Sequence, residues 1–112
     1  MGEIPDVTKI VANWNGELMP LSEVKVSVLD RAFLFGDSVY EVIRVYSGRL
    51  FRPQDHLDRL KDSLASLAIK GVDIDLVRKR IEETLAHSKL TSALAYLQVT
   101  RGEAPRAHAF PD

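Results

Sequence analysis

The chain has 112 residues, with 15 basic and 16 acidic side chains, a formal net charge of −1 and no cysteine. This balance gives no reason to expect nucleic acid or an anionic membrane as a partner, and the missing cysteine excludes disulfides, thiolate catalysis and cysteine metal sites. The 46% hydrophobic content predicts one domain with a single core. No apolar run approaches membrane-spanning length, so we expect a cytoplasmic protein. We expect no metal site.

The first quarter of the chain has the pattern of short strands. Residues 9–14 read as a strand, Asn15-Gly16 is a dipeptide typical of two-residue hairpin turns, and residues 17–19 form the returning strand. From Ser22 to Leu29 valines alternate with polar residues, which predicts a half-exposed strand.

The stretch from Asp30 to Leu60 concentrates the local signals. A polar turn opens it, and the run from Val39 to Tyr46 is rich in β-branched and aromatic residues, which predicts a strand. Alternation places Val39, Glu41, Ile43 and Val45 on one face and Tyr40, Val42, Arg44 and Tyr46 on the other. Such a strand is a reasonable lining for a pocket, although a buried core tyrosine is the commoner explanation. Ser47-Gly48 predicts a tight turn, with residues 49–52 pairing back.

Two helices are expected next. Pro53 suits the first turn of a helix, whose apolar stripe comprises Leu57, Leu60, Leu64 and Leu67. Gly71 is the expected C-terminal cap.

A second helix should follow Asp73 or Asp75, with its buried line at Val77, Ile81 and Leu85 and a solvated basic face at residues 78–80. Residues 93–100 predict a last strand. This order of elements indicates an α+β domain, with a mainly antiparallel sheet and two helices.

A resemblance to a known family emerges from these motifs. The stretch DRAFLFGDSVYEVIRVYSGRLFRPQDHLDRL, residues 30–60, resembles the N-terminal signature of the fold type IV pyridoxal-phosphate enzymes. These include D-amino-acid aminotransferases, branched-chain aminotransferases and aminodeoxychorismate lyase. The block at residues 96–108 resembles the D-amino-acid aminotransferase branch. This implies amino-group transfer from a D-alanine-like amino acid to a 2-oxo acid, with pyridoxal 5′-phosphate (PLP) as cofactor, in a homodimer formed through this domain.

The resemblance gives Arg59 a role in cofactor binding. On composition alone, an arginine at the edge of an apolar stripe is solvated or salt-bridged. The family's His-x-Asp-Arg-Leu motif, however, matches His56, Asp58, Arg59 and Leu60, and its arginine binds the cofactor phosphate. A guanidinium is permanently charged and offers paired donors to a dianion. His56 is expected to be structural.

Four further residues are expected at the substrate. The tyrosine of the Gly-Asp-x-Val-Tyr-Glu motif is Tyr40, which the resemblance places beside the cofactor and the substrate carboxylate, and Val42 shares its strand face. Without the resemblance both would be assigned to the core. The resemblance also implies that Arg106 and His108 bind the α-carboxylate from the neighbouring subunit. On sequence alone this basic stretch is more typical of an ordinary surface loop.

No lysine of this chain stands in a motif matching the family's Schiff-base lysine, which belongs to a second, C-terminal domain. We therefore expect residues 1–112 to be an N-terminal domain that has no catalytic residue and is inactive alone. Its residues 33–35 are expected to be left exposed. The alternatives are an aminodeoxychorismate lyase, a branched-chain aminotransferase, or a non-catalytic oligomerisation module with the same fold.

Overall fold

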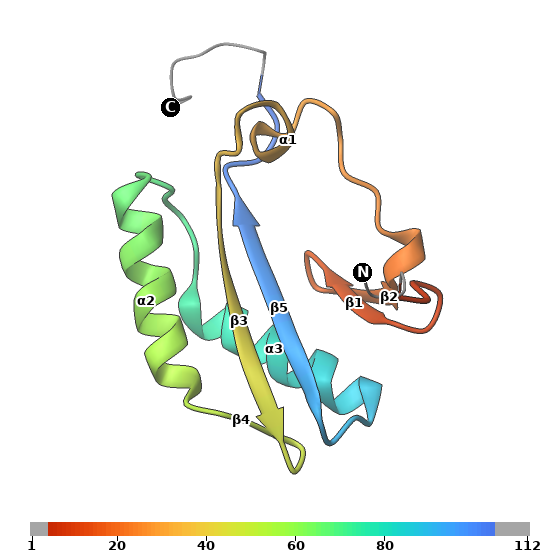
Figure 1. Cartoon of the computed structure of the whole chain (residues 1–112). Coiled ribbons are helices and arrows are strands. Elements are labelled where there is room, and N and C mark those ends of the chain that lie inside the picture. The colour runs from red at the N-terminus through yellow and green to blue at the C-terminus, as the bar shows by residue number, and fades with distance from the viewer. Residues whose placement is uncertain (1–4, 105–112) are drawn as a thin grey trace.

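The computed structural model describes residues 5–104, which form two antiparallel sheets and three α-helices (Figure 1). The α+β class with antiparallel pairing is thereby confirmed. In chain order the elements are β1 (Val11–Trp14), β2 (Glu17–Pro20), the 3₁₀ turn η1 (Leu21–Glu23), α1 (Arg31–Phe35), β3 (Ser38–Tyr46), β4 (Arg49–Leu50), α2 (Pro53–Ser66), α3 (Ile74–Ser88) and β5 (Ala93–Thr100).

The first hairpin forms where the sequence predicts it. Asn15 and Gly16 have φ angles of 52° and 97°, the left-handed pair that a tight two-residue turn requires, and the Asn13 side chain accepts from the Gly16 N–H at 2.8 Å. This hairpin packs on α3, where the Arg80 guanidinium lies 3.1 Å from the point that a Gly16 Cβ would occupy. The prediction of a solvated face at residues 78–80 was therefore wrong for Arg80, which is half-buried.

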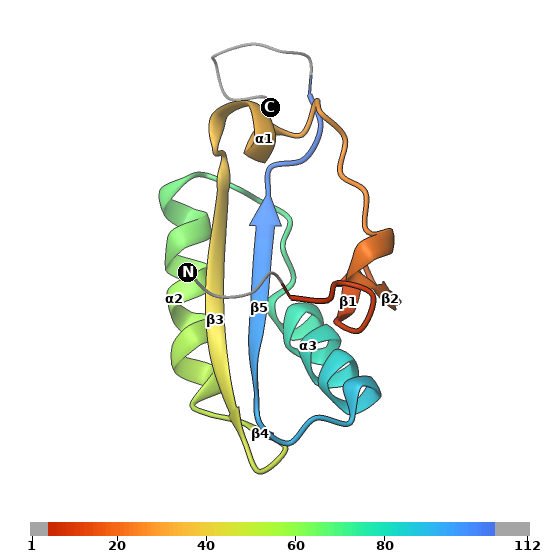
Figure 2. The same cartoon turned by 45° about the vertical axis from the view of Figure 1, so that its right-hand side comes forward.

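The second sheet has the order β4-β3-β5, with β3 in the middle and paired with β5 from Ser38↔Thr100 to Val45↔Ala93. The β4 arm is shorter than expected, because only Arg49 and Leu50 pair with β3. Figure 2 shows α2 running along β3 and α3 next to β5. The odd-numbered β3 residues are buried against the helices and the even-numbered ones lie on the opposite face, as the alternation predicts.

The core lies between this sheet and the two long helices. Leu57, Leu60 and Leu64 of α2 pack against Val39 of β3 and against Ile69, which follows the helix. The predicted line on α3, residues 77, 81 and 85, is only half-buried, although Val77 and Ile81 pack against this core. Two helices over one face of a three-stranded sheet therefore bury essentially one side of the sheet.

Two local predictions were wrong. Residues 24–29 form no strand, because no described strand runs beside them to satisfy their backbone groups, and Val26 and Val28 are exposed. The polar turn at Asp30 is instead the start of α1, where the Asp30 carboxylate accepts from the Ala32 N–H at 2.8 Å as an N-cap. Next to it, Phe33 is exposed as expected, whereas Leu34 and Phe35 are half-buried.

The end of α2 also differs from the prediction. Gly71 does not cap this helix; Ala68 takes the left-handed conformation, with φ 53°. The Ile69 N–H donates to the Leu64 carbonyl at 2.9 Å, and the Ala68 N–H donates to the Ala65 carbonyl at 3.1 Å, which together make a Schellman motif. The contact between Ile69 and Leu64 in the core accompanies it, so packing selects the cap position.

Candidate functional site

Glu41, His56 and Arg59 form a cluster between β3 and α2. Alternation along β3 turns Glu41 towards α2, where His56 and Arg59 lie three residues apart on the same helix face. The Glu41 carboxylate accepts from Arg59 Nε at 3.0 and 3.2 Å and from a terminal Arg59 nitrogen at 2.8 Å. His56 Nδ1 lies 2.8 Å from the same carboxylate.

The cluster joins a buried anion to an exposed cation. The Glu41 side chain is 5% exposed and that of Arg59 is 67% exposed. Hydrogen bonds from Arg59, helped by His56, outweigh burial and keep the pKa of Glu41 below its usual value, and Glu41 in turn raises the pKa of Arg59. Both groups are therefore charged across the physiological pH range.

The exposed edge of Arg59 fits a phosphate group. A guanidinium has five N–H donors, of which Glu41 engages Nε and one terminal nitrogen. Within the described residues, the other terminal nitrogen is left to face a ligand. A rigid, permanently charged donor pair is the chemistry that phosphate recognition uses. The donor set thus suits the cofactor phosphate that the resemblance assigns to Arg59.

Tyr40 and Val42 lie on the opposite, open face of β3. Tyr40 is 63% exposed and stacks on Tyr96 of β5, with the ring centroids 5.7 Å apart and the planes 21° apart. Val42 pairs in register with Tyr96. This arrangement forms an apolar wall that ends in phenolic hydroxyls, and it adds Tyr96, which was not predicted as a site residue, to the predicted Tyr40. The signal for Tyr96 was its place in the alternation of residues 93–100.

Tyr40 and Arg59 are therefore separated by β3 itself. β4 pairs with β3 only at Val45 and Tyr46, so among the described strands none covers the edge of β3 beside Tyr40 and Glu41. A ligand that contacts both Arg59 and Tyr40 must extend around this edge. The structure does not bring the two side chains into direct contact.

A second charged cluster ties the end of β5 to the turn before β3. Asp37 accepts from Arg31 Nε at 3.2 Å and from Arg101 Nε at 2.6 Å, and all three side chains are at most 9% exposed. Burial raises the pKa of Asp37, but the hydrogen bonds from the two arginines outweigh this effect and leave the pKa below its usual value. Arg101 also donates to the carbonyl oxygens of Leu67 and Ala68 at the end of α2. No local sequence pattern predicted this cluster.

Arg106 and His108 lie outside the described residues, so their placement remains a prediction. The chain that leads to them is anchored, because the Arg31 N–H donates to the Gly102 carbonyl at 2.9 Å and Asp30 forms a β-bridge with Glu103. These contacts are made at the start of α1, and Arg31 also belongs to the Asp37 cluster.

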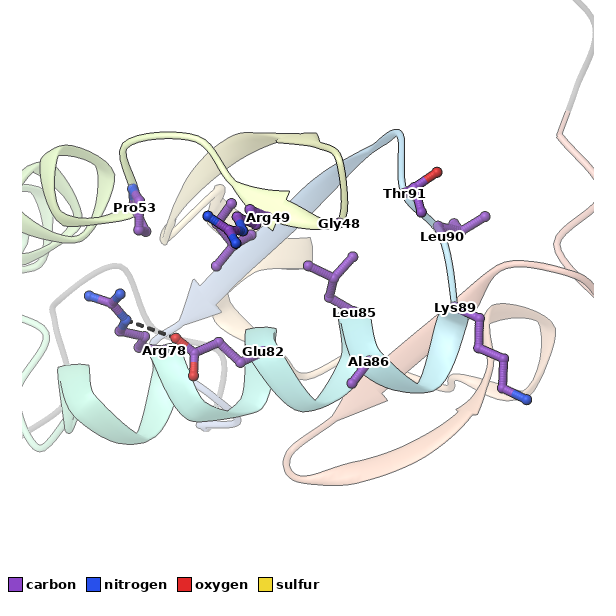
Figure 3. Close-up of a pocket in the computed structure, with 11 residues that line it drawn as sticks. Gly48, Arg49, Pro53, Arg78, Glu82, Leu85, Ala86, Lys89, Leu90 and Thr91 are labelled. Atoms are coloured by element: carbon purple, nitrogen blue, oxygen red, sulfur yellow. Dashed lines mark hydrogen bonds and ion pairs between the residues drawn. The ribbon is translucent and has the colours of Figure 1, made fainter.

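An open groove of the described chain lies elsewhere, between the β3–β4 turn and the second half of α3 (Figure 3). Its volume is about 550 Å³ and it is open to solvent. Arg78 is paired with Glu82 in this groove, and Figure 3 shows Lys89 pointing away from the other residues. The lining residues are Gly48, Arg49, Leu50, Pro53, Arg78, Glu82, Leu85, Ala86, Lys89, Leu90 and Thr91. None of the predicted site residues that the structure describes lines it.

Within residues 5–104, no helix is long and apolar enough to cross a membrane, and no group of three or more histidine, aspartate or glutamate side chains is arranged to bind a metal ion.

Comparison with known proteins gives consistent results. The model of the family described as amino-transferase class IV matches residues 38–112. A D-alanine aminotransferase of Bacillus licheniformis is 41% identical over 101 residues, which cover 87% of this chain and 35% of the relative. The chain thus spans about a third of the length of the relatives that it matches.

Solved structures show the same architecture. A 4-amino-4-deoxychorismate lyase from Pseudomonas aeruginosa is 34% identical, with a TM-score of 0.67 over 80% of this chain and 32% of the lyase. A branched-chain amino acid aminotransferase from Escherichia coli is 28% identical, with a TM-score of 0.79 over 87% of this chain and 35% of that protein. Another solved branched-chain amino acid aminotransferase, 26% identical, is complexed with N-(5′-phosphopyridoxyl)-L-glutamate; its TM-score is 0.76 over 83% of this chain and 33% of that protein.

Proposed function

Because the chain belongs to the class IV amino-transferase family, we propose that residues 1–112 are the N-terminal domain of a PLP-dependent D-amino-acid aminotransferase. Such an enzyme transfers an amino group from a D-amino acid, such as D-alanine, to a 2-oxo acid. The observation that carries the proposal is the 41% identity with a D-alanine aminotransferase over 87% of the chain. The remaining two-thirds of the enzyme would supply the lysine that binds PLP, so the chain alone is inactive. We also propose a cytoplasmic homodimer.

In this function, the described residues bind and orient the reactants. PLP, when bound, supplies an electron sink for the bonds to the substrate Cα. Arg59 binds its phosphate through the guanidinium edge that Glu41 leaves exposed. Tyr40 donates its hydroxyl to the substrate carboxylate, while its ring and Val42 form an apolar wall.

Arg106 and His108 complete the carboxylate-binding group in this proposal. A guanidinium offers two donors to a carboxylate, and the histidine adds a third that can be charged near neutral pH. Where the carboxylate is held decides the direction in which the Cα hydrogen points. These residues therefore select the enantiomer that reacts.

Two other enzymes of this fold are alternatives. An aminodeoxychorismate lyase is favoured by the 34% identity with the lyase from Pseudomonas aeruginosa, and a branched-chain aminotransferase is favoured by the higher TM-score of the enzyme from Escherichia coli. A non-catalytic oligomerisation module is the third candidate, which the open aromatic face of β3 and β5 would suit. Sequencing past Asp112 discriminates it from an enzyme, because an enzyme needs a downstream lysine and an acidic partner for the PLP ring nitrogen.

The test uses a completed enzyme, meaning this chain joined to its own downstream sequence or, if there is none, to the C-terminal part of the Bacillus licheniformis relative. In this enzyme, Arg106→Ala should lower kcat/KM for D-alanine by about ten- to a hundredfold, since charge-assisted hydrogen bonds to the carboxylate are lost. Its affinity for PLP should stay the same. Arg59→Ala should instead weaken PLP retention first, measured by equilibrium dialysis.

Three results would contradict the proposal. One is unchanged D-alanine kinetics in Arg106→Ala, and another is unchanged PLP binding in Arg59→Ala. The third is a preference of the unmodified enzyme for L-leucine over D-alanine, which would support the branched-chain alternative.

A further inference from the structure

Glu41 has a charge that its position in the core does not require. It lies on β3 between Val39 and Ile43, on the face that packs against α2, and it pairs in register with Leu97. A buried carboxylate loses hydration, and an apolar residue of similar size often stabilises such a position at least as well. Stability alone therefore does not account for Glu41.

What Glu41 does accomplish is to fix Arg59. Both of its oxygens accept from the guanidinium, and His56 Nδ1 contacts Oε1 from the same helix. An arginine that is 67% exposed would otherwise sample many rotamers, and a ligand would have to order it on binding. Here the ordering is already achieved by a carboxylate that is itself held in a packed strand.

We propose that Glu41 is a positioning residue that orients the Arg59 guanidinium for the cofactor phosphate, with His56 orienting Glu41. The inference rests on the proposed function of Arg59 and extends it to residues that contact neither cofactor nor substrate. Pre-organisation of one long side chain strengthens binding by removing the entropy loss on association.

The negative charge of Glu41, by contrast, should weaken the binding of the PLP phosphate. A carboxylate on one edge of the guanidinium repels a dianionic phosphate on the other edge, so a Glu41 that merely competed for Arg59 would weaken PLP binding. The two roles therefore predict changes of opposite sign when the charge is removed. Positioning predicts weaker PLP binding in Glu41→Gln, whereas competition predicts tighter binding.

The experiment measures the PLP dissociation constant of the completed apoenzyme by fluorescence titration, together with the ³¹P NMR shift of the bound phosphate. Glu41→Gln should raise the dissociation constant roughly two- to tenfold and move the ³¹P resonance. Glu82→Gln is the matched control, since its Arg78 pair on α3 has a similar Nε–Oε1 distance of 2.9 Å but lies outside the site. The control should leave both quantities unchanged. An unchanged or lower dissociation constant in Glu41→Gln overturns the inference.

Two further variants keep the result interpretable. If Glu41→Gln fails to fold by circular dichroism, Glu41→Asp, which keeps the charge but shortens the reach, should show the same weakening; unaltered PLP binding there overturns the inference. In an Arg59→Ala background, Glu41→Gln should add no further loss. If Arg59→Ala itself leaves PLP binding intact, the proposed function of Arg59 fails; if only the Glu41 variants do so, positioning alone fails.

Discussion

Asp37→Asn should be among the most destabilising single substitutions in this chain. One Asp37 oxygen accepts from both Arg31 and Arg101, whose side chains are 2% and 9% exposed, and the other is buried with no hydrogen-bond partner among residues 5–104. Asparagine keeps the shape of the side chain but removes the negative charge that faces the two arginines. Removing one partner of a buried ion pair costs about 3 to 5 kcal/mol. Domains of this size are stable by only about 5 to 15 kcal/mol, so a large share would be lost.

The assay is equilibrium urea unfolding of the 112-residue chain, followed by circular dichroism at neutral pH. Glu82→Gln is again the control, because it removes a carboxylate from an arginine pair on the surface, and such pairs contribute about 1 kcal/mol or less. The comparison therefore isolates the effect of burial. A loss below about 1 kcal/mol in Asp37→Asn, equal to that of the control, would refute the reasoning that the cluster depends on this charge.

Two further predictions concern stability. The pKa values of Asp37 and Glu41 in the folded chain lie below their ordinary values of 3.8 and 4.5. In acid, the folded chain therefore binds fewer protons than the unfolded chain does. Their stabilisation is complete above about pH 5 and is lost as the pH falls through the lowered folded values; urea midpoints that stay constant from neutral pH to about pH 3 would contradict this. Ala68→Gly should stabilise the chain by about 0.5 to 1 kcal/mol, because φ at this position is 53° and glycine adopts it without strain. Ala65→Gly, inside α2, should destabilise it by a similar amount, and equal effects of the two substitutions would argue against the cap assignment.

Local sequence predicted the elements whose causes are local. The Asn15-Gly16 turn, the alternation of residues 39–46 and the leucine stripe of α2 depend on backbone preferences and on side-chain periodicity within a few residues. The start of α3 belongs to the same class, since the sequence offered Asp73 or Asp75 before this helix and Asp73 is its N-cap. The family was also recognisable from the chain itself, because its motifs lie within residues 30–60 and 96–108.

Tertiary structure decided the partners. Alternation placed Glu41 on the same face as Val39 and Ile43, but only the docking of α2 on β3 identifies its partner Arg59, 18 residues later. Likewise, 64 residues separate Asp37 from Arg101. No periodicity carries information over such separations.

Where a local preference competed with packing, packing prevailed. Gly71 was the better residue for a left-handed cap, yet Ala68 takes that conformation because ending α2 there lets Ile69 enter the core. Residues 24–29 have the alternation of a strand, but no strand within the described part of the chain pairs with them. Sequence by itself determined which segments could form helices and strands in this protein. Only the assembled fold decided which of them did, because burial and hydrogen-bond partners are properties of the whole chain.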